Sequence, residues 1–178
     1  MAAYINAFFE ERVQQLFDLA DVAHRIFSSA GLEYGIVGGV AVYLYVAERE
    51  PDAGRLTRDV DVAIRRADLG RIVKAAAKFG FEHRHVAGVD MLARAGQPSA
   101  RRAIHLCPEG IEPGTFREIR GLRLIPLADL VRMNLTSFRL KDQTHLKDMD
   151  EAGLITAEIE AHLPPALTQR RAEVRAHA

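Results

Sequence analysis

The sequence has almost no cysteine and no excess of either charge. Cys107 is the only cysteine in 178 residues, so the chain cannot form an internal disulfide, and no zinc-type ligand spacing is present. Lysine plus arginine equals aspartate plus glutamate at 24 each, which gives no overall sign of a nucleic-acid or membrane partner. A single cysteine fits a reducing compartment, and we expect a cytoplasmic protein.

Long apolar runs and several familiar motifs are also missing. No apolar run reaches the length of a membrane span, and charged residues such as Glu10 and Glu11 stand where a signal peptide would need an apolar segment. The chain has no internal repeats, no low-complexity segment and no nucleophile elbow. These absences argue against a membrane partner and against chemistry through a covalent serine nucleophile.

The chain contains enough apolar residues to form one hydrophobic core, because they make up 48% of the composition. We expect a single domain over 1–178 of the α+β class, with a mixed and mostly antiparallel sheet flanked by helices. Residues 1–125 would hold an N-terminal helix and a catalytic core. Residues 126–163 would form C-terminal helices, and residues 164–178 a loosely attached tail.

Periodicity and turn residues predict the individual elements. Apolar residues at helical spacing predict a long first helix that ends before Gly31. The expected helices are 4–30, 40–47, 68–78, 126–138, 141–151 and 156–163. The expected strands are 34–37, 59–64, 81–86, 89–92, 102–107 and 122–125, with a connecting loop over 108–121.

A glycine pair and a carboxylate pair are the features that indicate chemistry. Gly38 and Gly39 allow a tight turn between a strand and a helix, and free amides at a helix start attract anions. Asp59 and Asp61 are two positions apart on a predicted strand, so both side chains project to one face. Two such carboxylates beside a phosphate-binding turn suit magnesium and a nucleoside triphosphate. The alternative is an ordinary turn next to two solvated carboxylates.

These residues also resemble a known family. The segment Gly38-Gly39-x-Ala41 together with Thr57-Arg58-Asp59-x-Asp61 is similar to the signature of the nucleotidyltransferase superfamily, which includes polymerase beta, antibiotic nucleotidyltransferases and AbiEii-type toxins. The segment 127–148 is similar to the C-terminal helical motifs of small bacterial members. The resemblance therefore covers most of residues 33–150.

The resemblance implies a fold, an activity and roles for particular residues. Gly38 and Gly39 would contact the nucleotide phosphates, and Asp59 and Asp61 would bind Mg²⁺ or Mn²⁺. The enzyme would transfer a nucleoside monophosphate from a triphosphate such as ATP to a hydroxyl. The acceptor would be RNA such as a tRNA end, a protein side chain or a small molecule. Similarity to the toxins further implies that an antitoxin could be a partner.

The sequence departs from the family pattern where active members carry a third carboxylate. Alternation along the strand 102–107 places His105 at that position. A neutral imidazole there would serve as a general base or as a metal ligand; the alternative is that it fills a polar pocket and activity is reduced or lost. Asp90 is a second candidate for the missing carboxylate, against the alternative of a solvated aspartate near a turn.

A second departure lies in the helix after Pro126, where Asn134 falls on the inward stripe and related proteins often have a lysine. Without that lysine, positive charge for the triphosphate would come from Arg139 or Lys141, and Asp142 would orient one of them or contact the substrate. The alternative is a solvated charged helix face. We include Arg58 among the phosphate contacts, although a structural ion pair fits it equally well.

The sequence therefore supports three hypotheses. The first is a metal-dependent nucleotidyltransferase with Asp59, Asp61 and His105 as its catalytic residues. The second is a catalytically reduced protein that keeps the fold to bind a nucleotide or a partner, as the imidazole at His105 and the amide at Asn134 suggest. The third is an interaction module, such as one half of a toxin and antitoxin pair.

Overall fold

The structure is a computed structural model that describes residues 2–55, 57–96, 102–108 and 115–176, with the side chains of residues 2–10 left out. The described residues form two compact units. The first consists of residues 1–40 and 56–124, and the second of residues 41–55 and 125–178. The predicted limit between core and C-terminal helices, at 125, is one residue from this division.

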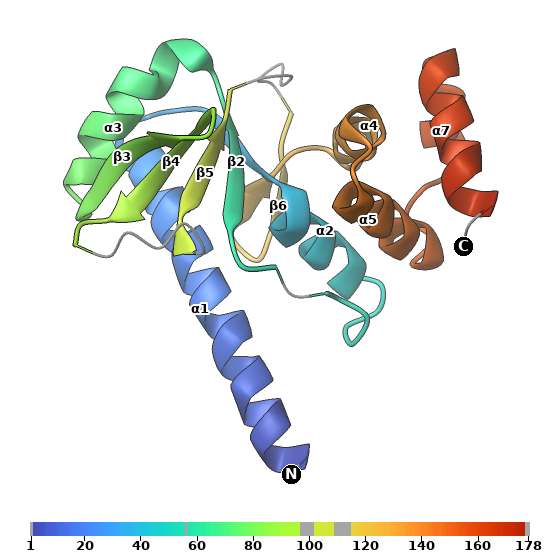
Figure 1. Cartoon of the computed structure of the whole chain (residues 1–178), viewed down its shortest axis with the longest axis horizontal. Helices are drawn as coiled ribbons and strands as arrows, with labels where there is room; N and C mark the ends of the chain where they lie inside the picture. Colours follow the sequence, from blue (N-terminus) through green and yellow to red (C-terminus); the bar gives the residue numbers. More distant parts are fainter. Residues whose placement is uncertain (1, 56, 97–101, 109–114, 177–178) are drawn as a thin grey trace. The chain divides into compact units, whose positions relative to one another are not determined.

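The first unit contains one mixed sheet of seven strands (Figure 1). Their order across the sheet is β3-β4-β5-β2-β1-β7-β6. Two neighbouring pairs, β1 with β7 and β2 with β5, are parallel, and the other four pairs are antiparallel. The strands are β1 (Tyr34–Val37), β2 (Val60–Ile64), β3 (Phe81–Val86), β4 (Val89–Arg94), β5 (Ile104–Cys107), β6 (Arg117–Ile119) and β7 (Leu122–Leu124). The mixed, mostly antiparallel sheet of an α+β fold is confirmed.

Two helices cover one face of this sheet. They are α1 (Ala2–Ser29) and α3 (Leu69–Ala77), which follows a short 3-10 turn, η1 (Arg66–Asp68), and the two helices contact each other (Figure 1). Tyr34 of β1 stacks on Phe27 of α1 with ring centroids 4.8 Å apart. Val62 and Ile104 project to the same face and are fully buried. Asp61 and His105 alternate with these residues and therefore project to the other face.

The second unit is helical. It contains most of α2 (Gly38–Ala47), together with α4 (Leu127–Ser137), α5 (Leu140–Glu151), α6 (Ala157–Ala161) and α7 (Pro165–Ala176). Leu130, Leu146 and Met149 are fully buried between these elements. The hydroxyl of Tyr45 donates a hydrogen bond to the carbonyl of Ile125 over 2.7 Å, which joins the two segments of this unit.

The segment 164–178 differs from the predicted tail, because residues 165–176 form helix α7 and only 177–178 lie outside the described residues. Arg171 of α7 is 3% exposed and pairs with Asp150 of α5 and with Glu160 of α6, the latter over 3.0 Å. Val174 is buried beside it. A buried guanidinium held by two carboxylates attaches this helix, so the prediction of a loose tail was wrong.

The predicted loop 108–121 also needs a correction. Residues 109–114 of it lie outside the described residues, but residues 117–119 form β6, which pairs with β7. Arg120 and Gly121, both with positive φ, make the two-residue turn between them. At α3, Asp68 precedes the helix as predicted, yet its side chain makes no cap hydrogen bond and instead accepts one from Arg71 over 3.1 Å.

Candidate active site

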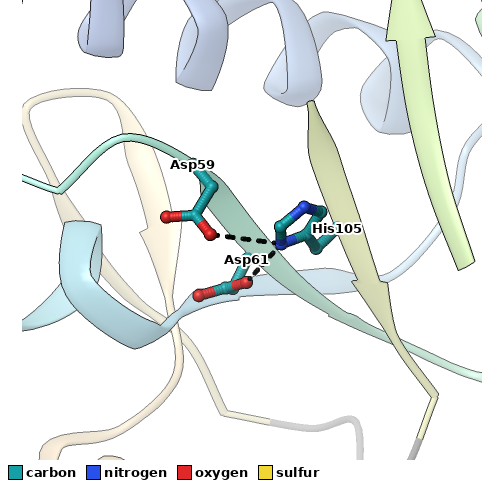
Figure 2. A group of neighbouring side chains, drawn as sticks. All are labelled: Asp59, Asp61 and His105. Atoms are coloured by element: carbon teal, nitrogen blue, oxygen red, sulfur yellow. Dashed lines mark hydrogen bonds and ion pairs between the residues drawn. The ribbon is translucent and has the colours of Figure 1, made fainter. Parts of the chain in front are cut away.

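Strand pairing brings the predicted carboxylates and the imidazole together in the first unit. In the parallel pair β2 and β5, Asp61 lies directly opposite His105. Residues in register project to the same face, so both side chains meet on the face away from α1. Asp59 precedes β2 by one residue and projects the same way as Asp61. Figure 2 shows the three side chains converging.

The imidazole contacts both carboxylates. Nδ1 of His105 lies 3.3 Å from Oδ2 of Asp59 and 3.2 Å from Oδ1 of Asp61 (Figure 2). The other oxygen of Asp59, Oδ1, accepts a hydrogen bond from Oγ1 of Thr57 over 3.0 Å. All three site side chains are less than one-third exposed, at 29% for Asp59, 14% for Asp61 and 18% for His105. They form a partly buried, hydrogen-bonded cluster.

These contacts determine the charge of His105. Its hydrogen bond with Asp59, followed by the one with Asp61, raises the pKa of the ring from 6.5 to about 10, although burial acts in the opposite direction. The ring therefore carries a proton at pH 7 while both carboxylates contact it. This corrects the neutral imidazole expected from the sequence, and the reason is that two anions share one ring nitrogen.

The glycine pair is required by close packing against this cluster. Val37 at the end of β1 lies opposite Asp61, so the turn into α2 begins beside that carboxylate. Gly38 has φ +62, and a β-carbon there would lie 2.2 Å from Oδ2 of Asp61. A β-carbon on Gly39 would lie 2.7 Å from Cβ of Thr57. Glycine thus allows the start of α2 to approach the carboxylates, and helix amides at that point favour anions.

The donor set fits a divalent cation. Asp59, Asp61 and His105 each offer one ligand atom, and these atoms lie within 4.8 Å of one another. Carboxylate oxygens suit Mg²⁺, and the addition of an imidazole nitrogen shifts the preference towards a softer cation such as Mn²⁺. A cation bound here would neutralise phosphate charge. It would also compete with the proton on His105.

The remaining predicted phosphate contacts lie in different places. Arg58 is an exposed residue of the first unit. Arg139, Lys141 and Asp142 belong to the second unit at the start of α5, where Lys141 is exposed. Asp142 accepts hydrogen bonds from Nε and the backbone N of Arg139 over 2.9 and 3.0 Å. The roles of all four in nucleotide binding stay predictions.

Two side chains of α4 and α5 are occupied by hydrogen bonds within the second unit. Although burial raises the pKa of Asp142, hydrogen bonds from Arg139 and Ser137 outweigh it and lower that pKa. Asn134 is buried, donates to the carbonyl of Leu130 over 2.8 Å and lies 3.1 Å from Nδ1 of His145. Asn134 therefore points inward as predicted, and its amide forms polar contacts within its own unit.

Asp90 does not join the carboxylate pair. It lies opposite Leu106, one residue from the Met91–His105 pair, and so projects to the face opposite that of His105. Its carboxylate contacts Nδ1 of His85 over 2.8 Å and Nε2 of His83 over 3.0 Å. These hydrogen bonds lower the pKa of Asp90, with that from His85 the largest cause. This cluster was not predicted from the sequence, although pairing across the turn at Gly88 places His85 directly opposite Asp90.

Comparison with solved structures identifies the fold. The chain is similar to a solution structure of the antibiotic-resistance factor ANT(2'')-Ia, with a TM-score of 0.53 and 14% identity over 89% of this chain and 91% of the other. It is also similar to a crystal structure of ANT(2'')-Ia in complex with adenylyl-2''-tobramycin, with a TM-score of 0.54 and 14% identity over 89% and 97% of the two chains. The chain has a nucleotidyltransferase fold. The resemblance inferred from the glycine and aspartate motifs is confirmed at the level of this fold.

Comparisons of sequence alone do not add to this result, because no protein-family model and no curated protein matches the chain. The nucleotidyltransferase fold therefore rests on the similarity of architecture. None of the helices in the described part of the chain is long and apolar enough to cross a membrane.

Thr57 is the site residue whose role was missed. Its hydroxyl donates a hydrogen bond to Asp59, and its side chain fills the space that a β-carbon on Gly39 would need. Thr57 therefore connects the glycine turn with the carboxylates. The signal was its position two residues before Asp59, from which its hydroxyl reaches the carboxylate.

Proposed function

We propose that this protein is a divalent-metal-dependent nucleotidyltransferase that transfers a nucleoside monophosphate from a triphosphate to a hydroxyl group of a small molecule. The observation that carries the proposal is the convergence of Asp59, Asp61 and His105 beside the glycine turn at Gly38. The nucleotidyltransferase fold supports it. The known structure with adenylyl-2''-tobramycin supports a small-molecule acceptor over RNA.

The chemistry needs positioning and charge neutralisation more than a covalent nucleophile. The acceptor oxygen bonds to the α-phosphorus, the bond from that phosphorus to the β-phosphate oxygen breaks, and pyrophosphate leaves. Asp59 and Asp61 would hold Mg²⁺ or Mn²⁺, which supplies positive charge against the phosphate oxygens. The amides at the start of α2 bind phosphate, Thr57 orients Asp59, and His105, when neutral, accepts the proton of the hydroxyl.

The test is transfer of label from α-labelled ATP to a panel of hydroxyl compounds, with pyrophosphate release followed in parallel. Asp59→Asn plus Asp61→Asn should reduce the rate by at least about a hundredfold, because the metal loses its anionic ligands. Asp52→Asn is the matched control, since Asp52 is an exposed aspartate of the second unit. Transfer that is unchanged in the double variant would refute the proposal.

A second candidate is a catalytically reduced nucleotide-binding protein. It is favoured by the protonated ring of His105, which already supplies a positive charge to both carboxylates where a metal would do so. This candidate expects ATP binding that does not depend on Mg²⁺ and no pyrophosphate release with any acceptor. Calorimetric titration of ATP with and without Mg²⁺ distinguishes the two functions. Transfer to RNA and a role as a toxin with an antitoxin partner stay predictions from the sequence alone.

A further inference from the structure

A cavity of the first unit lies beside the carboxylate cluster, and arginine is the most frequent residue type in its described lining. Its volume is about 580 Å³, within the usual range for small-molecule sites. One wall is α1. The other is the sheet edge where β2 and β5 begin and where the antiparallel β4 ends. The lining includes Thr57 and five arginines, namely Arg12, Arg25, Arg58, Arg94 and Arg102.

The charge of this pocket differs from that of the whole chain. Lysine and arginine balance aspartate and glutamate over the full sequence. Among the described residues of the pocket lining, five arginines face two carboxylates, those of Asp18 and Asp21, which is an excess of three positive charges. Guanidinium groups at this density repel one another, and a bound anion relieves that repulsion.

The described residues give a carboxylate partner for Arg25 but for neither Arg58 nor Arg102. Asp21 pairs with Arg25 over 3.0 Å, and both side chains are more than half exposed. Arg94 lies over the ring of Phe81, 5.3 Å from its centroid. Among the described residues, Arg58 and Arg102 form no ion pair. Their donors are therefore available to an oxyanion, which guanidinium binds with two parallel hydrogen bonds.

Thr57 connects this pocket to the carboxylate cluster. It lines the pocket and donates a hydrogen bond to Asp59 over 3.0 Å. Arg58 follows it and also lines the pocket, whereas the next residue, Asp59, contacts His105. A molecule anchored among the arginines would thus have its free end beside Thr57, next to the carboxylates.

We propose that this pocket binds the phosphate end of the acceptor, so that the substrate is a small hydroxyl compound that carries a phosphomonoester. The proposal rests on the transferase function proposed above and specifies its acceptor. A phosphomonoester carries about −1.5 to −2 charges at pH 7, which matches the positive excess better than a single carboxylate does. A cationic amino sugar is disfavoured by the same lining. The hydroxyl attacks the α-phosphorus, pyrophosphate leaves, and the product is a phosphodiester between acceptor and nucleotide.

The first test is binding, measured by calorimetry on the full chain with ribose 5-phosphate as the probe and ribose as the neutral match. Ribose 5-phosphate should bind at least about tenfold more tightly than ribose, because charge-assisted hydrogen bonds are made only with the phosphate. Its affinity should fall several-fold between 50 and 300 mM salt, on the order expected for screening of exposed arginines. Equal binding of the two sugars would overturn the proposal.

Substitutions locate the site. Arg58→Gln and Arg102→Gln should each weaken ribose 5-phosphate binding by about threefold to tenfold, since each removes one exposed guanidinium contact. Arg49→Gln is the matched control, because Arg49 is exposed and lies in the second unit. Losses that are the same in the control, or absent from both pocket variants, would contradict the proposal. So would a short RNA that binds at least a hundredfold more tightly than the sugar phosphate.

Turnover separates this inference from the function on which it rests. If pyrophosphate is released with neutral or cationic acceptors while ribose 5-phosphate does not bind, the acceptor assignment fails and the transferase function stands. If ribose 5-phosphate binds at the arginines but no acceptor yields pyrophosphate, the transferase function fails and the acceptor assignment fails with it. Adenylyl transfer to ribose 5-phosphate that is reduced in Arg102→Gln, with ATP affinity unchanged, is the expected result.

Discussion

Metal binding to the carboxylate cluster should compete with the protonated ring of His105. The ring lies 3.3 Å from Asp59 and 3.2 Å from Asp61, and these contacts raise its pKa to about 10. At pH 7.5 the ring is therefore cationic, and a divalent cation at the same carboxylates must displace its proton or push the ring away. Apparent metal affinity should consequently rise with pH.

The size of the effect follows from the pKa. Between pH 7.5 and a pKa of about 10 there are about 2.5 units, which at 1.36 kcal/mol per unit is roughly 3.4 kcal/mol. This value is an upper bound, because the ring can also swing out instead of losing its proton. We therefore expect Mn²⁺ affinity to increase by about threefold to tenfold per pH unit between pH 6.5 and 8.5.

The assay is calorimetric titration of Mn²⁺ into the full chain at three pH values, repeated in two buffers of different ionisation enthalpy to count the protons released. His105→Asn should bind Mn²⁺ with little pH dependence and no proton release over this range. His162→Asn is the matched control, because His162 is exposed and lies on the helical unit. An affinity of the unaltered protein that does not change with pH, or a slope that persists in His105→Asn, would refute the reasoning.

The same proton makes a prediction about the metal-free protein. Because the folded pKa of His105 is raised above 6.5, the ring stabilises the fold fully below pH 6.5 and loses this contribution as the pH rises towards about 10. The difference in free energy of unfolding between the unaltered protein and His105→Asn should thus be about 1–3 kcal/mol at pH 6 and smaller at pH 9.5. Urea unfolding at both pH values measures it, and a difference that grows with pH would have the wrong sign.

Two further substitutions test the packing described above. Gly38→Ala should lower the free energy of unfolding by about 2–3 kcal/mol, because alanine is strained at φ +62 and its β-carbon would lie 2.2 Å from Asp61. Gly70→Ala is the control and should be neutral or stabilising, because there is open space around Gly70. Urea unfolding measures both variants, and equal effects would contradict the close approach of Gly38 to Asp61. Arg171→Leu should lower the free energy of unfolding by about 2–4 kcal/mol, because two carboxylates would lose their buried partner. Arg175→Leu should lower it by less than about 1 kcal/mol, because the side chain of Arg175 is half exposed. Thermal unfolding compares the two variants, and similar melting temperatures would show that Arg171 does not hold α7.

Much of the site could be read from the sequence because it depends on local geometry. Alternation alone predicted that Asp59 and Asp61 project to one face, and that His105 projects to the face of its strand opposite Ile104 and Leu106. The pairing of β2 with β5 then places His105 next to the two carboxylates. The glycine pair was predicted to allow a tight turn. That Gly38 must also accommodate Asp61 depends on register between strands about 25 residues apart, which no local pattern contains.

The misses involve partners that are distant in sequence. Arg171 looked like a solvated residue of a charged tail, because the carboxylates that bury it come from α5 and α6. Strand β6 was predicted as part of a loop because the segment around it contains several glycine and proline residues. Arg120 and Gly121 nevertheless form a two-residue hairpin turn between β6 and β7. The proton on His105 could not be predicted, since its pKa depends on distances to two carboxylates, one just before the neighbouring strand β2 and one within it.

The division of the chain within α2 has a consequence for how the protein can be made and cut. Residues 41–55 belong to the same unit as residues 125–178, and the intervening segment forms the sheet unit. During synthesis, about seventy residues must therefore be added after residue 55 before the rest of the helical unit is made. The hydrogen bond from Tyr45 to Ile125 can form only after that. No single cleavage of the backbone separates the two units, because a fragment that contains all of one unit, such as 1–124 or 41–178, also contains a segment of the other.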